Sequence, residues 1–379
     1  MINYIVVGRE RSVTLAVLQA VRSFTDAGCM VIGTRANRGL RWSSLCQRLV
    51  TMRFDGADDD RVVALVNDLA RHTRHMTLIA ADSAAIRMVN RVAGRLPVAI
   101  APIPDTPTLT MLDDRWRFLR LCRQHQLPVP VTRLIGGEAE PEFPALAAEL
   151  GLPFIVKPID RRHPASVVVR CRRDLWRLPA RGLLLAQRIA PGVEVGMQLL
   201  ADRGQLGALA LTGLNAEQAE RFRPELERLA ARLCHVSAFN GAMRLRARID
   251  AVGAITLIDC IPHFCTDLTA AILSGLNLVA ESVQPAPRHD GPHRILQSDL
   301  SVGHPLAPGR WRRLSAADEG GRLLRAMSLD LYSLSLATGS LLRSAYRSVA
   351  SRRPMKTLPA TPALNRRQNA TAGQAATGS

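Results

Sequence analysis

Apolar runs and amphipathic stretches alternate through the first hundred residues. Short apolar runs, typical of buried strands, fall at 4–7, 29–33, 49–54, 76–80 and 97–101. Between them, apolar residues recur with helical spacing at 12–27, 58–72 and 83–94. Strands that are apolar on every residue are typical of a sheet covered by helices on both faces. The pattern therefore predicts a parallel, doubly wound α/β sheet.

The pattern changes in the rest of the chain. Prolines concentrated in 102–108 predict a linker, and a helix is predicted at 110–126. From 131 to 283, strands and helices follow one another without simple alternation, which predicts an α+β region. An amphipathic and basic pattern covers 322–350. The residues from Pro354 onward are rich in Thr, Ala, Asn, Gly and Gln, and this composition predicts disorder.

Composition bounds the class of protein and its compartment. A chain of 379 residues, 47% of them hydrophobic, can bury the cores of two or three domains. No apolar run approaches the roughly 18 residues that a membrane-spanning helix needs. The start of the chain, 1–7, lacks a basic region and is predicted to be a strand rather than a secretory signal. The seven cysteines are scattered, which is typical of thiols in a reducing cytosol, so a cytoplasmic protein is expected.

The formal net charge of +18 invites a nucleic-acid interpretation. The distribution of the charge argues against one, because the C-terminal segment 331–379 is basic without any acidic residue and the remaining excess is spread thinly. Aromatic residues make up only 4% of the chain, which leaves few platforms for stacking bases. A basic adaptor at nucleic acid or membrane is therefore a weak alternative. The stretch 322–350 could meet an anionic membrane peripherally, but Gly339 interrupts it and favours one or two helices that pack on the grasp domain.

Lysine usage singles out one position. Among the 50 basic residues only Lys157 and Lys356 are lysines, so arginine serves almost everywhere else. Lys157 ends the apolar run that begins at Leu152. A compact ammonium on a flexible stem differs chemically from a planar guanidinium, so Lys157 is a candidate for a specific contact.

Four segments, in this order and spacing, resemble the ATP-grasp superfamily, particularly its carbamoyl-phosphate-synthase-like carboxylate ligases. The segments are 113–130, 152–158, 185–195 and 241–264. They are similar, respectively, to the helix and turn that open the grasp domain, its lysine-bearing strand, the hinge strand beside the adenine, and the strand pair that holds the metal. The resemblance implies an α/β pre-grasp domain with a parallel doubly wound sheet, followed by an α+β ATP-grasp domain of two lobes.

The implied domain boundaries follow from these segments. The expected parts are a pre-ATP-grasp domain and linker at 1–108, the ATP-grasp domain at 109–285, a helical extension at 286–353 and a disordered basic tail at 354–379.

The resemblance also implies a set of ATP-binding residues. Arg115 and Lys157 would meet the phosphates as cations, and Glu194 would accept hydrogen bonds from the ribose hydroxyls. Backbone groups beside the adenine would come from Gln187, Arg188 and Ile189. The alternative for each charged residue is an ordinary solvated side chain.

The strand pair at 241–264 departs from the family pattern at its metal site. Arg246 and Ile261 replace an acidic and an Asn ligand, and His263 replaces an Arg that would meet phosphate or the acyl intermediate. Only Asp259 keeps an oxygen ligand for Mg²⁺. Arg246 and His263 thus stand at catalytic positions with altered chemistry. Arg246 is hypothesised to replace a metal ion by a fixed positive charge, and the alternative for His263 is a packed side chain.

The loop after Lys157 departs as well. A glycine-rich phosphate lid should follow there, but the segment 159–170 contains no glycine and carries Arg161, Arg162 and His163 instead. Backbone N–H groups that glycines would present to phosphate would have to be replaced by side-chain cations.

The function implied by the resemblance is an ATP-dependent ligase. It would use ATP, with Mg²⁺ at a partial site, to convert a small-molecule carboxylate to an acyl phosphate that an amine or another nucleophile then captures. The alternative is a non-catalytic relative that binds a nucleotide or a partner.

Overall fold

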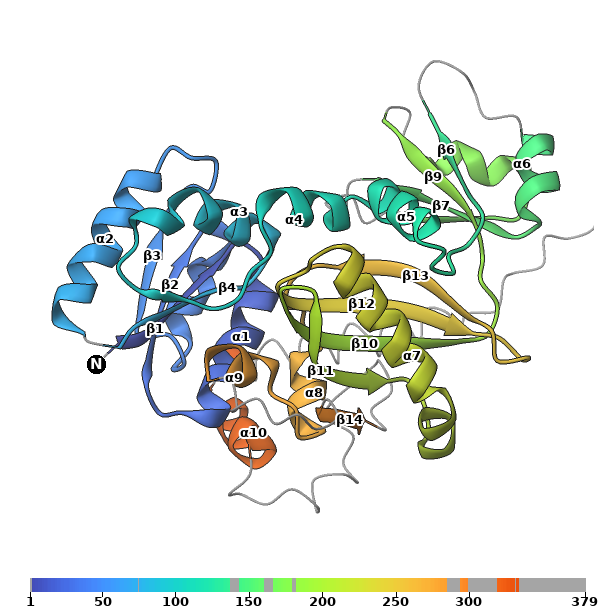
Figure 1. Cartoon of the computed structure of the whole chain (residues 1–379). Coiled ribbons are helices and arrows are strands. Elements are labelled where there is room, and N and C mark those ends of the chain that lie inside the picture. Colours follow the sequence, from blue (N-terminus) through green and yellow to red (C-terminus); the bar gives the residue numbers. More distant parts are fainter. Residues whose placement is uncertain are drawn as a thin grey trace, which may run out of the picture. The chain divides into compact units, whose positions relative to one another are not determined.

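The structure is a computed structural model that describes residues 2–73, 75–136, 143–159, 166–178, 182–284, 294–298, 319–330 and 332–333. All of them fall within one compact unit, residues 1–335 (Figure 1). The predicted disordered tail and the arginines of the loop after Lys157 lie outside the described residues.

A five-stranded parallel sheet forms the first region. Its strands are β1 (Ile2–Gly8), β2 (Gly28–Gly33), β3 (Arg48–Thr51), β4 (Thr77–Ala80) and β5 (Ala99–Ile100), in the order β3-β2-β1-β4-β5. Helices α1 (Arg11–Phe24), α2 (Asp59–His72) and α3 (Ser83–Val92) connect them, with short 3₁₀ helices η1 (Arg35–Trp42) and η2 (Ala93–Arg95). The central strand β1 is buried from Tyr4 to Gly8, as its continuous apolar sequence predicts. The predicted parallel α/β sheet is confirmed.

The predicted linker and the helix after it differ from the prediction. Helix α4 (Thr106–Asp113) begins inside the linker, because Asp105 caps it and Pro107 lies in its first turn, where proline is tolerated. The chain then breaks at Asp114, whose side chain caps a second helix, α5 (Arg115–Gln124). The single helix predicted at 110–126 is therefore wrong.

A four-stranded antiparallel sheet follows. It consists of β6 (Thr132–Ile135), β7 (Phe154–Pro158), β8 (Val167–Val169) and β9 (Leu184–Arg188) in the order β6-β9-β7-β8. Helix α6 (Phe143–Leu150) and the 3₁₀ helix η3 (Arg172–Arg177) accompany it. Leu146 and Leu150 of α6 share a hydrophobic cluster with Phe154 and Val156 of β7.

The third sheet carries the remaining strands. They are β10 (Val193–Asp202), β11 (Gln205–Thr212), β12 (Gly241–Ile249), β13 (Ile255–Ile261) and β14 (Arg294–Ser298), in the order β13-β12-β10-β11-β14. Helix α7 (Ala216–Val236) packs on one face, where Leu226, Leu229 and Leu233 join the apolar residues of β10 and β12 in one core. Helices α8 (Leu268–Leu273) and α9 (Leu278–Val283) follow β13. The parallel and antiparallel sheets match the predicted order of α/β before α+β.

The chain returns to the first region at its C-terminal end. Helix α10 (Glu319–Leu329) contacts both α1 and α8. As far as the amphipathic stretch is described, it therefore packs on the first region as well as on the domain that was expected. The segment 286–353, expected to be helical, also contributes strand β14.

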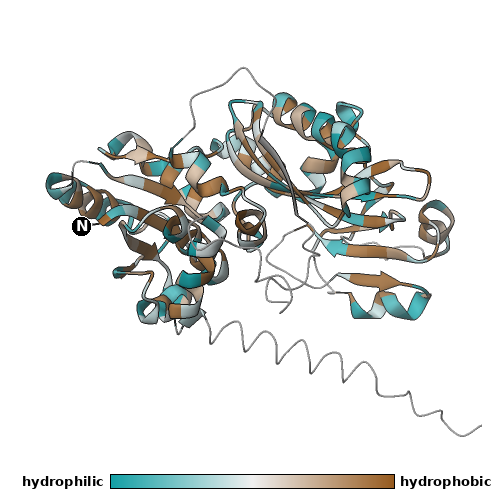
Figure 2. Ribbon diagram, turned by 90° about the horizontal axis from the view of Figure 1, so that it is seen from below, coloured by the Kyte–Doolittle hydropathy of each residue, from teal (hydrophilic) through white to brown (hydrophobic). Residues whose placement is uncertain are grey.

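The hydropathy of the ribbon follows this architecture. In Figure 2 the strands are mostly brown, whereas teal lies along the outward sides of the helices. Within the described residues, no helix is long and apolar enough to cross a membrane. All seven cysteines are free thiols, and all but Cys171 are buried, so the prediction of buried thiols holds for six of them.

Candidate functional site

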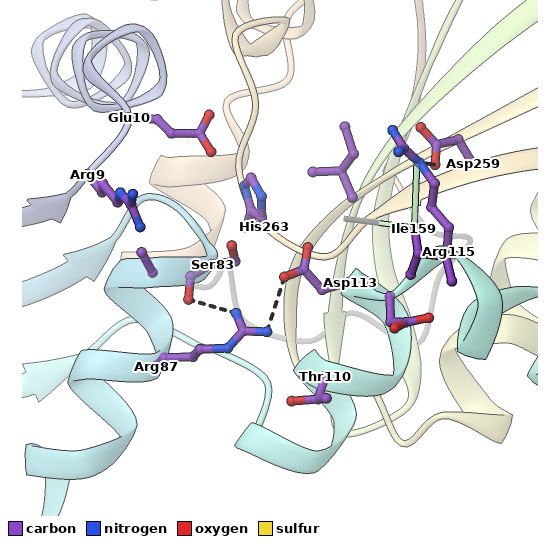
Figure 3. A pocket seen from close by; sticks show the side chains of 13 residues that line it. Arg9, Glu10, Ser83, Arg87, Thr110, Asp113, Arg115, Ile159, Asp259 and His263 are labelled. Carbon is purple, nitrogen blue, oxygen red and sulfur yellow. Dashed lines mark hydrogen bonds and ion pairs between the residues drawn. The ribbon is translucent and has the colours of Figure 1, made fainter. Parts of the chain in front are cut away.

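A cavity of about 650 Å³ opens where the parallel sheet meets the start of α5 and the end of β13. Figure 3 shows its side chains, which come from sequence positions more than 200 residues apart. The lining residues are Arg9, Glu10, Ser83, Ala84, Arg87, Thr110, Asp113, Asp114, Arg115, Ile159, Asp259, Ile261 and His263. The wall carries both cations and carboxylates, so the cavity suits a polar ligand with charges of both signs.

The loop after β1 supplies Arg9 and Glu10. Asp82 fixes this loop, because its Oδ2 accepts hydrogen bonds from the backbone N–H groups of Arg9 at 2.6 Å and Glu10 at 2.8 Å. Its Oδ1 accepts one from Ala85 at 2.9 Å and so caps α3. Asp82 is 1% exposed, which makes it a rigid anchor. One buried carboxylate thereby sets the positions of two cavity residues.

Glu10 is the carboxylate that the loop presents to the cavity. Within the described part of the chain, its side-chain oxygens accept no hydrogen bond and form no ion pair. Burial raises the pKa of Glu10, the charge of His263 opposes that rise, and the carboxylates of Asp82 and Asp113 add to it. A carboxyl that lines the cavity without an ion-pair partner among the described residues is suited to receive a cationic group or a proton from a ligand.

Helices α3 and α4 meet in an ion pair beside the cavity. Arg87 Nη2 donates to Asp113 Oδ2 at 3.2 Å, and its Nη1 donates to the carbonyl of Ser83 at 3.2 Å (Figure 3). This pair joins the parallel sheet region to the helix that leads into α5, so it fixes two walls of the cavity relative to each other.

Another wall comes from β13 and the residues just after it, and Asp259 is the acidic residue of this wall. Its Oδ1 lies 3.9 Å from Arg115 Nε, and its Oδ2 lies 3.8 Å from Arg246 Nη1. A β-bulge opposite Arg246 and Ala247 places Asp259 on the same face as Arg246, opposite the apolar core. Arg115 is held in turn, because its Nη1 donates to the carbonyl of Pro158 at 2.7 Å.

Arg246 also binds the carboxylate of Glu194. Its Nε donates to Glu194 Oε1 at 2.8 Å, and Nη2 lies 2.6 Å from the same oxygen. The side chains of Arg246 and Glu194 are 34% and 30% exposed, so a ligand can reach both. The residue predicted to bind ribose and the residue predicted to replace a metal ligand are therefore partners.

These residues do not fit a Mg²⁺ ion. Each oxygen of Asp259 faces a guanidinium, and Ile261 offers no ligand. Among the described residues, no group of three or more His, Cys, Asp or Glu side chains could hold a metal ion. Proteins usually hold Mg²⁺ by one or two carboxylates, with waters and substrate phosphates completing its octahedron, and here the one acidic residue at the expected position faces two cations. The role of Asp259 as a metal ligand stays a prediction.

His263 lies on the cavity wall, 8% exposed. Its Nδ1 is 2.6 Å from the carbonyl oxygen of Phe264. A carbonyl oxygen can only accept, so Nδ1 carries the hydrogen, and Nε2 remains for a ligand. The predicted catalytic position of His263 is therefore compatible with its placement.

The four-stranded sheet holds Lys157 and Gln187 together. Lys157 Nζ donates to Gln187 Oε1 at 2.9 Å, and Gln187 Nε2 donates to Thr132 Oγ1 at 2.9 Å. Gln187 is 3% exposed, so this chain of hydrogen bonds is fixed within the sheet. Ile159, two residues beyond Lys157, lines the cavity, which brings this strand end to the same site.

The remaining adenine candidates lie at the end of β9. The backbone N–H of Arg188 donates to the carbonyl of Val131 at 2.9 Å, and its guanidinium donates to the carbonyls of Glu149 and Leu150 at the end of α6. Gln187 pairs with both neighbouring strands. Ile189 lies just beyond the strand. The roles of these three residues toward adenine stay predictions.

The structure thus brings Arg115, Asp259, His263, Arg246 and Glu194 into one neighbourhood. The cavity residues of the first region were not among the site residues predicted from the sequence. A signal existed, because strand order reverses at β1, between β2 and β4, and ligands of open α/β sheets bind beyond the strand ends at such a reversal. That rule points to the loops after β1 and β4.

Comparisons with known proteins address the fold. No protein-family model matches the chain. The chain is 33% identical over 95 residues to a D-alanine–D-alanine ligase of Chromohalobacter salexigens, a match covering 24% of this chain and 30% of that ligase. It is 33% identical over 115 residues to the same kind of ligase from Laribacter hongkongensis, covering 29% and 35%. The chain thus spans about a third of the length of these relatives.

Solved structures match over a larger part of the chain. N5-carboxyaminoimidazole ribonucleotide synthetase of Thermotoga maritima matches with a TM-score of 0.54 at 12% identity, covering 76% of this chain and 77% of that one. Carboxyaminoimidazole ribonucleotide synthase of Aspergillus clavatus, complexed with ATP, matches with a TM-score of 0.57 at 15% identity, covering 78% and 80%. The L-amino acid ligase of Bacillus licheniformis matches with a TM-score of 0.54 at 14% identity, covering 75% of each chain. The fold is that of the ATP-grasp superfamily of carboxylate ligases. The resemblance stated from the four sequence segments is thereby confirmed.

Proposed function

We propose that this ATP-grasp chain binds ATP and uses it to join a small-molecule carboxylate to an amine. The observation that carries the proposal is the cavity itself. On this fold it brings the carboxyl of Glu10, the imidazole of His263 and the guanidinium of Arg115 to one space, next to the strand that bears Lys157. That combination provides cations for phosphate and a carboxyl for an amine.

The reaction has two balanced steps. A carboxylate oxygen of the substrate attacks the γ-phosphorus of ATP, the bond from this phosphorus to the bridging oxygen breaks, and ADP leaves. The amine then attacks the acyl carbon, inorganic phosphate leaves with the bonding electron pair, and the amine loses a proton. We assign Glu10 to hold the amine and accept this proton, because its carboxyl lines the cavity and its pKa is raised from the ordinary value.

We assign phosphate binding to the cations of the site. Lys157, oriented by Gln187, and Arg115, oriented by the carbonyl of Pro158, approach from β7 and α5. Fixed cations on separate elements can position a triphosphate between them. Glu194 retains its Oε2 for a ribose hydroxyl, because Arg246 contacts only Oε1.

The second candidate is a relative that binds nucleotide without turning it over. It is favoured by Asp259, whose oxygens face guanidinium groups where oxygen ligands for a metal were expected. Calorimetric titration with ATP, followed by an ADP-release assay over a library of carboxylates and amines, tests both candidates. ADP release that requires a carboxylate supports the ligase. ATP binding without ADP release for any pair of carboxylate and amine supports the second candidate. Absence of ATP binding refutes both.

A further inference from the structure

The part of the site that departs most from an ordinary nucleotide site is the group Glu194, Arg246, Asp259 and Arg115. Arg246 occupies the middle, with Glu194 Oε1 at 2.6 Å from Nη2 and Asp259 Oδ2 at 3.8 Å from Nη1. The two acids and the two guanidiniums compensate one another in charge. A divalent cation has no net negative charge to attract it here, and at Asp259 it would meet a guanidinium on each side.

Arg246 still has bonding capacity for a ligand. A guanidinium carries five N–H donors, and Glu194 engages only the Nε and Nη2 side of this one. The Nη1 side faces Asp259 at 3.8 Å, which is longer than a hydrogen bond, and the side chain is 34% exposed. A phosphate oxygen can therefore reach Nη1 without breaking the contact with Glu194.

We propose that Arg246 takes the place of a divalent cation in this site, so that the protein binds ATP as the free polyanion and not as its magnesium complex. The proposal rests on the proposed nucleotide binding and concerns the form in which the nucleotide binds. Glu194 then has a second role, because it orients Arg246 while its other oxygen meets the ribose. A fixed cation supplies charge to the phosphates without the ordered oxygen octahedron that Mg²⁺ demands.

The decisive measurement compares ATP binding to the unmodified protein in EDTA and in excess Mg²⁺ by calorimetry. We expect the affinity in EDTA to equal or exceed that in Mg²⁺, because Mg²⁺ removes charge from the phosphates that Arg246 would otherwise bind. Titration with MgCl₂ alone should give no binding heat. Binding at least tenfold tighter in Mg²⁺ would overturn the proposal but leave nucleotide binding intact. No ATP binding under either condition would refute the proposed function and, with it, this inference.

Variants of Arg246 give an independent test. Arg246→Gln should lose about tenfold or more in ATP affinity in EDTA, the usual loss of one charge-assisted hydrogen bond. Arg246→Glu combined with Ile261→Asn restores oxygen ligands beside Asp259, and its ATP binding should become at least fivefold tighter when Mg²⁺ is added. If Arg246→Gln binds ATP as the unmodified protein does in EDTA, Arg246 is not the replacement.

The matched control is Arg228→Gln. Arg228 also pairs with a glutamate, Glu225, at 2.6 Å, but it is 57% exposed on α7, which packs on the opposite face of the sheet. The ATP affinity of Arg228→Gln should equal that of the unmodified protein, both in EDTA and in excess Mg²⁺. Thermal melting of each variant shows whether it is folded. The comparison of ATP binding in EDTA and in Mg²⁺ uses the unmodified protein and does not depend on any variant.

Discussion

Two regions of this chain bury aspartates in opposite ways. At the contact between the C-terminal segment and the first region, Asp330 is 1% exposed and is held by neutral donors. Its oxygens accept hydrogen bonds from the hydroxyl of Ser43 at 3.0 Å, the N–H of Ser44 at 2.9 Å and the N–H of Ser333 at 3.0 Å. At the cavity, Asp259 instead pairs with charged groups, the guanidiniums of Arg246 at 3.8 Å and Arg115 at 3.9 Å.

The difference indicates that Asp330 stabilises the fold, whereas Asp259 modifies the charge of the candidate site. Short bonds from several backbone and hydroxyl donors fix Asp330 and satisfy its charge inside the protein. The ion pairs of Asp259 offset part of the positive charge that Arg115 and Arg246 would present to a ligand. We therefore expect a substitution at Asp330 to change stability and one at Asp259 to change binding.

The largest effect is expected for Asp330→Asn. The new amide would place N–H groups against the donors of Ser43, Ser44 or Ser333, so we expect a loss of about 2–3 kcal/mol in the free energy of unfolding. Chemical denaturation followed by circular dichroism measures it. The control is Asp60→Asn, whose exposed carboxylate pairs with Arg95 and should cost well under 1 kcal/mol. Equal costs for the two variants would show that the C-terminal contact adds nothing.

The stability difference between the unmodified protein and Asp330→Asn should also depend on pH, in a direction set by the pKa of Asp330. Burial alone would raise the pKa of Asp330, but hydrogen bonds from Ser333, Ser44 and Ser43 outweigh it and lower the pKa below its ordinary value. A lowered pKa in the folded state adds stability above the unfolded value of about 4, and this stability is lost as pH falls through the folded value. The advantage of the unmodified protein over Asp330→Asn should therefore shrink only in acid below about pH 4.

Lys157→Ala should have the next largest effect, on the cavity side of the comparison. Loss of one charge-assisted contact with phosphate is worth about 1.5–3 kcal/mol, so ATP affinity should fall at least tenfold with the fold intact. Calorimetry with ATP measures it. The control is Arg133→Gln in the same sheet, where an exposed cation pairs with Glu149 and no loss is expected. Unchanged affinity in Lys157→Ala would mean that the phosphates bind elsewhere.

The fold was largely predictable, and the exceptions have local physical causes. The buried parallel strands β1, β2 and β4 carry mostly apolar residues, and the shorter β3 and β5 lie in apolar runs, so all five could be predicted within a few residues. The break between α4 and α5 could not, because Asp114 is compatible with a helix interior until its side chain is seen to cap Arg117. A single polar residue within a helical pattern does not reveal whether its side chain bonds to solvent or to the backbone.

The site was predicted less completely, because its geometry depends on pairing between strands. Strict alternation from Leu257 would place Asp259 on the core face of β13, and only the bulge opposite Arg246 turns it to the other face. The partnership of Glu194 with Arg246 depends on the register between β10 and β12, which two separate motifs do not specify. Arg9 and Glu10 could not be singled out, because their place in the cavity depends on how their loop is held by Asp82, far along the chain.

Asp259→Asn is expected to change binding moderately and in an informative direction. If Asp259 only weakens the attraction of Arg115 and Arg246 for phosphate, removal of its negative charge should strengthen ATP binding in EDTA. The gain should reach at most about fivefold, because the pairs are partly screened by solvent. If Asp259 were a metal ligand, the variant would instead weaken binding in Mg²⁺. Calorimetry in both buffers decides between these outcomes, and the melting temperature should change much less than in Asp330→Asn.

The smallest effect concerns Glu10, whose pH dependence should run opposite to that of Asp330. Burial raises the pKa of Glu10, so its ionised form costs stability; the contribution of the carboxyl is fully present below the unfolded value of about 4.3 and is lost as pH rises through the higher folded value. Glu10→Gln should therefore match the unmodified protein in acid and become slightly more stable above that window, by well under 1 kcal/mol, because solvent reaches the side chain. Denaturation across pH 3–8 measures the difference. A stability gain that is the same at every pH would show that the charge of Glu10 is already compensated, and it would remove the reason for assigning this residue to the amine.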